Sequence, residues 1–123
     1  MKHIKIAAGL AHVNYGRIAD VVKEASEAGV DYIHSDAADM HDLQNMKLMG
    51  GHQIIAGIRP ETDKPIECHI YTVSMDEMFI EQIHQAGADM LIIPAEHFIG
   101  AQLAYTKNEG WLNAWLLHTA LLC

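Results

Sequence analysis

Hydrophobic residues follow two different spacings along the chain, and these predict a series of strands and helices. Short apolar runs predict strands, whereas an apolar residue at every third or fourth position predicts a helix. The predicted strands cover residues 4–10, 30–36, 65–71 and 88–93, and the predicted helices cover 15–28, 52–58, 74–86 and 98–106. This alternating order is typical of a parallel sheet that is covered by helices.

Several residues predict where the helices begin and end. Gly29 and Gly87 each follow a helical pattern, and both are expected to form C-terminal caps. Ser74 is expected to begin the third helix as a capping residue. Pro60 is expected to end the second helix, and the segment 59–64 has the composition of a turn. The residues expected to face inward from the third helix are Met78, Phe79, Ile83 and Ala86.

The sequence also contains an internal repeat. The segment E-A-G-V-D-Y-I begins at Glu27, and the similar segment Q-A-G-A-D-M-L begins at Gln85, 58 residues later. That displacement corresponds to two β-α units, each close to the usual length of ~30 residues. Such repetition is typical of a (β/α)8 TIM barrel, which needs ~250 residues. We therefore predict an α/β fold, a partial TIM barrel of about four β/α units with parallel strands, in this chain of 123 residues.

Composition narrows the classes of partner. Eight Lys and Arg against 16 Asp and Glu give a net charge of −8, and the basic residues are not clustered. We therefore expect no nucleic-acid partner. Cys68 and Cys123 have no motif spacing, which favours reduced thiols in a cytoplasmic protein. The start of the chain has no signal-peptide pattern, and we expect no membrane partner.

The last 16 residues depart from the pattern of the rest. Segment 108–123 contains both tryptophans, and apolar residues lie all round any helix drawn through it. A helix from Trp111 onward is too short to span a membrane. Two explanations stay open, namely a buried terminal helix, or an unrelated or out-of-frame tail after Lys107. The predicted domain boundaries are therefore 1–107 for the half barrel and 108–123 for the apolar tail.

Three side chains with suitable chemistry come at the ends of two predicted strands. His34 and Asp36 are two residues apart, so they share one face of a strand, and His69 ends the next strand. The carboxyl ends of parallel strands meet at one rim, where ligands bind. Two imidazoles and a carboxylate suit Zn, Fe, Mn or Co, and a carboxylate beside an imidazole can also move a proton. The alternative is a solvated His34 and Asp36 that open a loop. His41 follows in that loop and is within reach of the same rim.

Three stretches resemble the ribulose-phosphate 3-epimerase family. Residues 32–41, Y-I-H-S-D-A-A-D-M-H, resemble the family's Y-[IF]-H-x-D-x-M-D-G-H stretch. Residues 64–70, K-P-I-E-C-H-I, are similar to its third strand, and residues 86–93, A-G-A-D-M-L-I-I, align in step. The resemblance covers the N-terminal half of the family over about residues 5–107. It implies a TIM-barrel epimerase that uses a divalent metal to remove and return a proton at C3 of a ketose phosphate.

The resemblance also implies roles for individual residues. His34 and His69 would be metal ligands, and Asp36 would be both a ligand and the general acid/base. His41 matches the histidine of the family loop, and Gly9 stands in place of a serine near the substrate. We therefore expect Gly9 and His41 to be substrate-binding positions.

Departures from the family pattern leave the sugar open. Ala38 replaces a methionine, Met40 replaces a glycine, and Pro94 replaces a histidine of the fourth strand. The substrate is expected to be ribulose 5-phosphate or a related sugar phosphate.

In the family a second aspartate comes from the seventh strand, and the phosphate site follows the seventh and eighth strands. We therefore expect this chain alone to be a truncated, impaired enzyme.

Two other functions stay open. One is a keto-sugar-phosphate decarboxylase or hexulose-phosphate synthase on a similar barrel, although residues 67–70, E-C-H-I, do not match the Asp-x-Lys-x-x-Asp signature of those enzymes. The other is a non-catalytic remnant. Since half a barrel has open sheet edges, formation of a homo-oligomer is a further expectation.

Overall fold

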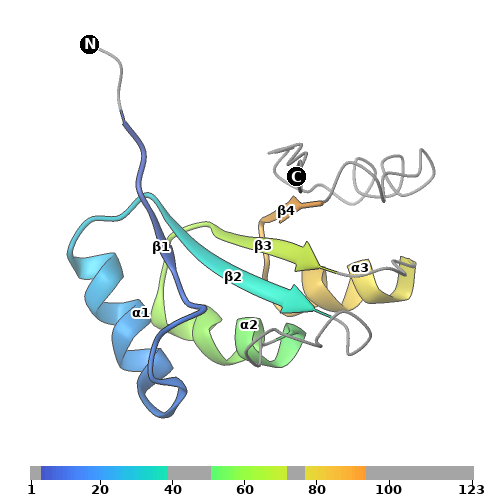
Figure 1. Cartoon of the computed structure of the whole chain (residues 1–123), viewed down its shortest axis with the longest axis horizontal. Coiled ribbons are helices and arrows are strands. Elements are labelled where there is room, and N and C mark those ends of the chain that lie inside the picture. The colour runs from blue at the N-terminus through green and yellow to red at the C-terminus, as the bar shows by residue number, and fades with distance from the viewer. Residues whose placement is uncertain (1–3, 39–50, 72–76, 94–123) are drawn as a thin grey trace, which may run out of the picture.

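The computed structural model describes residues 4–38, 51–71 and 77–93, which are the coloured parts of Figure 1. The strands are β1 (Ala7–Gly9), β2 (Tyr32–Ala38), β3 (Ile66–Tyr71) and β4 (Met90–Ile92). The helices are α1 (Ile18–Glu27), α2 (His52–Ile58) and α3 (Glu77–Gln85), with short 3-10 helices η1 (Tyr15–Arg17) and η3 (Arg59–Glu61).

The strands form one parallel sheet in the order β1-β2-β3-β4. Figure 1 shows the three α-helices on the same side of this sheet. In a doubly wound fold the helices cover both faces, whereas in a β/α barrel they all lie outside and the strands follow one another in sequence order. The arrangement is therefore that of part of a (β/α)8 barrel, which confirms the predicted fold class.

The hydrophobic core lies between the sheet and the helices. Every second residue of β2 and β3 points into it, because successive side chains of a strand alternate between the two faces. The core residues of these strands are Ile33, Ser35, Ala37, Ile66, Cys68 and Ile70. The helices contribute Val22, Ile55, Ile58, Ile80 and Ile83. The intervening strand residues are thereby directed to the other face of the sheet, which carries the chemistry.

The repeated sequence segments form the same helix-to-strand turn. Gly29 and Gly87 have φ angles of 89° and 105°, a region that residues with a Cβ rarely adopt. After each glycine, a backbone N–H donates back to the helix, from Val30 to the Ala25 carbonyl at 3.4 Å and from Ala88 to the Ile83 carbonyl at 3.3 Å. This is the Schellman motif, so both predicted glycine caps are confirmed.

An aspartate two residues after each glycine extends the repeat. The Asp31 carboxylate accepts a hydrogen bond from the N–H of Ile6 at 2.8 Å, and Asp89 accepts one from the N–H of Ile66 at 2.9 Å. Each aspartate thus ties the start of its own strand to the start of a neighbouring strand. The sequence repeat therefore encodes a recurring connection at the amino ends of the strands, away from the rim where barrels bind ligands.

Arg59 distinguishes the second copy of this turn from the first. Its Nη1 donates to the Gly87 carbonyl at 3.2 Å and to the Asp89 carboxylate at 3.0 Å. Its Nη2 donates to the carbonyls of Thr62 and Lys64 at 2.6 and 2.8 Å. One guanidinium therefore joins η3, the approach to β3 and the turn before β4.

The strands differ at their ends from the predicted ranges. The first strand is shorter than 4–10 because β1 pairs with β2 only over three residues. The second begins at Tyr32 because Val30 and Asp31 belong to the turn, and it runs to Ala38 because pairing with β3 continues to that residue. The third begins after Pro65, which has no N–H to donate. The fourth covers 90–92, since it pairs with β3 only over these residues and the Ala88 N–H bonds back to Ile83 of α3.

The helices also differ in detail. The predicted helix 15–28 is split into η1, capped by the Asn14 side chain at the Gly16 N–H, and α1. The helix over 52–58 is confirmed, but Pro60 does not end the helical path and lies inside η3, where its missing N–H is tolerated. The inward position of Met78 is wrong, because its side chain is 66% exposed and Ile80 is buried instead.

Some expectations fall outside the described residues. These are the loop over 39–50 with His41, the cap at Ser74, the helix over 98–106 and the tail 108–123. Among the helices that the structure does describe, none has the length and apolar character needed to cross a membrane.

The exposed side chains before β1 bear on self-association. Ile4 and Ile6 are 83% and 59% exposed, and within the described sheet β1 has β2 as its only neighbour. We expect a second copy of the chain to cover this edge, because exposed apolar strand edges favour association. Sedimentation velocity should show species above monomer mass, and Ile4→Lys with Ile6→Lys should shift them to monomer. Unchanged sedimentation of the double variant would argue against this edge.

Candidate metal centre

The sheet face opposite the helices carries two imidazoles and two carboxylates. His34 and Asp36 come from β2, and Glu67 and His69 come from β3. In the register of these strands, His34 is paired with Glu67 and Asp36 is paired with His69. Each imidazole therefore lies beside a carboxylate of the neighbouring strand. Imidazoles and carboxylates alternate both along each strand and between the two strands.

Three of these side chains converge on one point. Asp36 Oδ1 lies 3.4 Å from His34 Nε2 and 3.6 Å from His69 Nδ1. One donor atom from each residue can be chosen so that all three lie within 4.8 Å of one another. Metal bonds of ~2 Å place donors about 3–4 Å apart, so small side-chain rotations would complete this arrangement. The structure thus brings together the three residues that the sequence predicts as ligands.

The burial of the cluster argues against solvated loop residues. His34, Asp36 and His69 lie within regular strands, with side-chain exposures between 10% and 24%. The alternative in which His34 and Asp36 open a loop is therefore wrong. Two imidazole nitrogens and one carboxylate oxygen form a donor set that suits Zn, Fe, Mn or Co.

The electrostatics of the site centre on His34. Hydrogen bonds to Asp36 and then to Glu67 raise the pKa of His34 from 6.5 to about 9, against the opposing effect of burial. His34 is therefore a cation at neutral pH when no metal is bound. Since a ligand imidazole must be neutral, metal binding has to release this proton.

Glu67 is a site residue that the sequence reasoning did not select. Its Oε1 lies 2.7 Å from His34 Nδ1, on the side of the ring opposite Nε2. The alternation of the third strand does place Glu67 on the face of His69, which is a usable signal. Its partner His34, however, is 33 residues away in sequence, and only the strand register brings the two together.

The predicted substrate positions have different outcomes. Gly9 is the register partner of His34 on β1, so it lies beside the cluster. A Cβ built on Gly9 meets nothing within 4 Å, so a serine side chain fits there. His41 lies outside the described residues.

Cys68 lies on β3 between Glu67 and His69 but belongs to the other face. It is a buried, free thiol. Burial, reinforced by the charge of Asp36, raises the pKa of the Cys68 thiol to about 12. A thiol of this kind stays protonated and unreactive, so Cys68 is a core residue and not a fourth ligand.

Comparison with known proteins gives one consistent result. The model of the ribulose-phosphate 3 epimerase family matches residues 5–117 and reaches into the segment 108–123. Ribulose-phosphate 3-epimerase of Synechocystis sp. is 32% identical over 96 residues, which cover 78% of this chain and 40% of that protein. For the Bacillus subtilis enzyme, identity is 31% over 93 residues, covering 76% and 42%. For the chloroplastic Arabidopsis thaliana enzyme, it is 27% over 106 residues, covering 86% and 37%. The chain thus spans 37–42% of the length of these relatives.

Proposed function

We propose that this chain, which belongs to the ribulose-phosphate 3-epimerase family, provides the metal-binding, proton-transferring rim of a carbohydrate epimerase. The observation that carries the proposal is the convergence of His34, Asp36 and His69 at the carboxyl ends of adjacent parallel strands. In β/α barrels this end of the strands is where substrates bind. The names of the similar proteins support the same chemistry.

The proposed ligands are His34 through Nε2, His69 through Nδ1 and Asp36 through a carboxylate oxygen. The bound Zn, Fe, Mn or Co ion would supply Lewis-acid stabilisation of oxygen atoms that gain negative charge. The two histidines fix the orientation of Asp36 between them, and all three are held by strands, which keep site geometry more closely than loops do.

Asp36 is the proposed general base. Its carboxylate would remove the proton from C3, the carbon next to the ketone of a ketose phosphate, and could return a proton only to the same face of that carbon, which exchanges the hydrogen without inverting C3. Ribulose 5-phosphate and related ketose phosphates are the proposed substrates, with Gly9 and His41 as proposed contacts. Inversion at C3 needs a second acid on the opposite side of the carbon. Among the four described residues that carry the chemistry of this sheet face, the other carboxylate, Glu67, is engaged by His34.

Because Asp36 acts on one face of C3 only, we expect this chain to carry out part of the reaction. We expect the Zn²⁺-loaded chain to exchange the C3 proton of ribulose 5-phosphate with deuterium oxide, measured by NMR, while net epimerisation stays far below an ordinary kcat of about 1–10³ s⁻¹. Asp36→Asn should abolish the exchange, because the amide cannot accept the proton.

The control for this experiment is Asp63→Asn, which makes the same chemical change at an exposed residue before β3. It should exchange at the wild-type rate. If the Zn²⁺-loaded wild-type chain exchanges the C3 proton no faster than a sample without protein, the result would contradict the proposed base and favour a non-catalytic remnant. Ordinary epimerisation rates would instead contradict the expected impairment of this chain.

The decarboxylase or synthase alternative gains no support. Its third-strand signature requires a lysine two residues after the first aspartate, and His69 stands at that spacing after Glu67. The family match also points to an epimerase.

We also propose a reducing, cytoplasmic compartment. The support is Cys68, a free and buried thiol, as expected where disulfides do not form. The relative from Arabidopsis thaliana is named as chloroplastic, so membership in the family does not by itself fix the compartment.

A further inference from the structure

We infer that Glu67 is a positioning residue of the metal centre, which holds the His34 imidazole so that Nε2 and not Nδ1 faces the metal. The inference rests on the proposed function, because it assigns a role around the same three ligands. Glu67 itself is not one of the residues in the converging cluster. Its Oε1 lies 2.7 Å from His34 Nδ1, the ring nitrogen on the other side of the imidazole from Nε2.

The chemistry of the two groups determines the tautomer. A neutral imidazole carries one N–H and one lone pair, whereas an ionised carboxylate can only accept hydrogen bonds. The contact with Glu67 Oε1 therefore requires the proton of a neutral His34 to be on Nδ1. The lone pair is then on Nε2, which lies 3.4 Å from Asp36 Oδ1 and is directed at the cluster. Metal-bound histidines commonly use such a carboxylate on the ring nitrogen that does not bind the metal.

The sheet provides the rigidity that this role needs. His34 on β2 and Glu67 on β3 are register partners, and these two strands have the longest ladder of the described sheet. The Glu67 side chain is 16% exposed, so little water competes for the contact. Glu67 also adds a second negative charge beside the proposed dication, which Asp36 alone would leave with a net charge of +1.

A purely structural role gives a different expectation. If the Glu67–His34 contact served only to hold β2 against β3, its loss would lower the free energy of unfolding and leave metal affinity and His34 ring chemistry unchanged. The two roles therefore differ in readouts other than stability.

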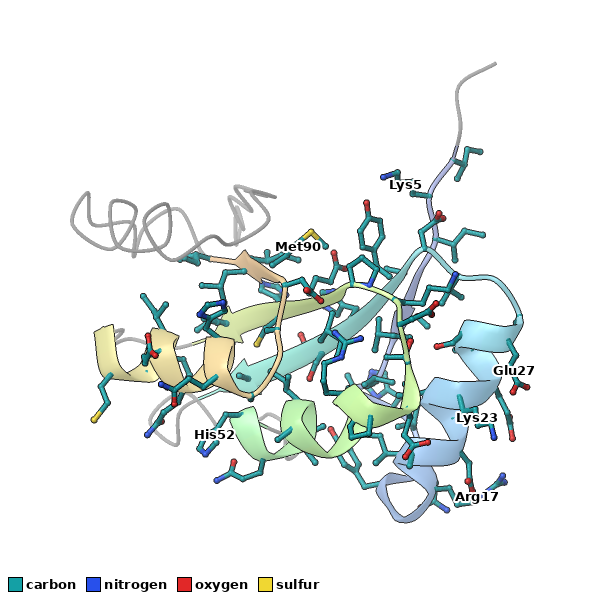
Figure 2. All side chains as sticks on the ribbon, turned by 180° about the vertical axis from the view of Figure 1, so that it is seen from behind. Lys5, Arg17, Lys23, Glu27, His52 and Met90 are labelled. Carbon is teal, nitrogen blue, oxygen red and sulfur yellow. The ribbon has the colours of Figure 1, made fainter. Side chains whose placement is uncertain are left out.

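The experiment compares Glu67→Gln and Glu67→Leu with the wild type. Glu67→Gln retains an oxygen acceptor in a side chain of the same shape but loses the charge. Glu67→Leu removes the acceptor. Glu27→Gln is the matched control, because it makes the same change of charge at an exposed residue of α1, far from the carboxyl ends of the strands in Figure 2. Affinity for Zn²⁺ is measured by chelator competition, and the His34 ring nitrogens of the Zn²⁺-loaded chain are observed by NMR.

We expect Glu67→Leu to lose about 10–100-fold in Zn²⁺ affinity, the usual effect of removing the partner of a ligand histidine. Glu67→Gln should lose less and retain the wild-type pattern, with the proton on Nδ1 and the metal on Nε2. In Glu67→Leu the Nδ1–H signal should shift or broaden. Circular dichroism and thermal unfolding verify that each variant is folded, and Glu67→Gln keeps the test decisive should Glu67→Leu fail to fold.

The outcomes separate this inference from the proposed function. If the wild type binds Zn²⁺ in a 1:1 ratio and both Glu67 variants match Glu27→Gln, the positioning role is overturned and the metal centre stands. Metal bound through Nδ1 of His34 in the wild type would also overturn it. If the wild type binds no Zn²⁺, the metal centre itself is overturned, and the role of Glu67 with it.

Discussion

Replacing either proposed histidine ligand by alanine is expected to lower the affinity of the chain for Zn²⁺ by more than ~100-fold, since losing only the partner of a ligand costs about 10–100-fold. His34 and His69 each supply one donor atom to a cluster that spans at most 4.8 Å. Removing one imidazole leaves a single nitrogen and one carboxylate, which is too few protein ligands for tight Zn²⁺ binding.

The same substitutions should leave the chain folded. Both side chains lie on the sheet face opposite the hydrophobic core, so no core cavity forms. Zn²⁺ titration with a competing chelator measures the affinity, and circular dichroism monitors the fold. His84→Gln is the control, because His84 is in the last turn of α3 on the helix side of the sheet. If His34→Ala and His69→Ala keep the affinity of His84→Gln, the ions bind elsewhere.

Gly87→Ala is expected to destabilise the chain more than Gly29→Ala does. Both glycines occupy the same position of a Schellman turn, with φ angles of 105° and 89°. At either position, an alanine would be held in a left-handed backbone conformation, which costs about 1–2 kcal/mol. A Cβ at Gly29 would meet nothing within 4 Å, whereas at Gly87 it would lie 2.6 Å from Cδ of Arg59.

Arg59 cannot move away from this contact without loss. Its guanidinium makes four hydrogen bonds that join the turn before β4 to the approach to β3. Leaving partly buried partners unsatisfied costs about 1–3 kcal/mol. Gly87→Ala should therefore exceed Gly29→Ala by at least ~1 kcal/mol in the free energy of unfolding, measured by urea denaturation. If both variants lose the same free energy of unfolding, the Arg59 side chain moves away from the new Cβ without a cost in stability, and the prediction is wrong.

The local features of the fold can be predicted from the sequence. The spacing of two between His34 and Asp36 places them on one strand face, and the glycines after two helical patterns mark left-handed caps. Such features depend on residues within a few positions of one another. This is why the two caps and the shared face of His34 and Asp36 follow from the sequence. The approach of His69 to them follows from a general rule of the fold, by which the carboxyl ends of parallel strands meet at one rim.

The features that the sequence leaves undetermined depend on contacts between distant segments. The pairing of Glu67 with His34 is set by the register of β2 and β3, which no local pattern specifies. The exposure of Met78 is set by how α3 rotates onto the sheet. Phe79, Ile80 and Ile83 form the stripe that packs there, and Met78 lies to one side of it. The predicted first and fourth strands extend beyond the observed ones, because pairing with the neighbouring strand covers only residues 7–9 and 90–92.

The most direct test of the metal centre is the position of a bound ion. Crystals of the chain grown with Zn²⁺ and measured at the zinc absorption edge should show one anomalous peak on the sheet face opposite the helices. We predict that it lies about 2.0–2.2 Å from His34 Nε2, His69 Nδ1 and an oxygen of Asp36. A peak away from these three atoms, or no peak at a Zn²⁺ concentration that saturates the chain in solution, would contradict the account.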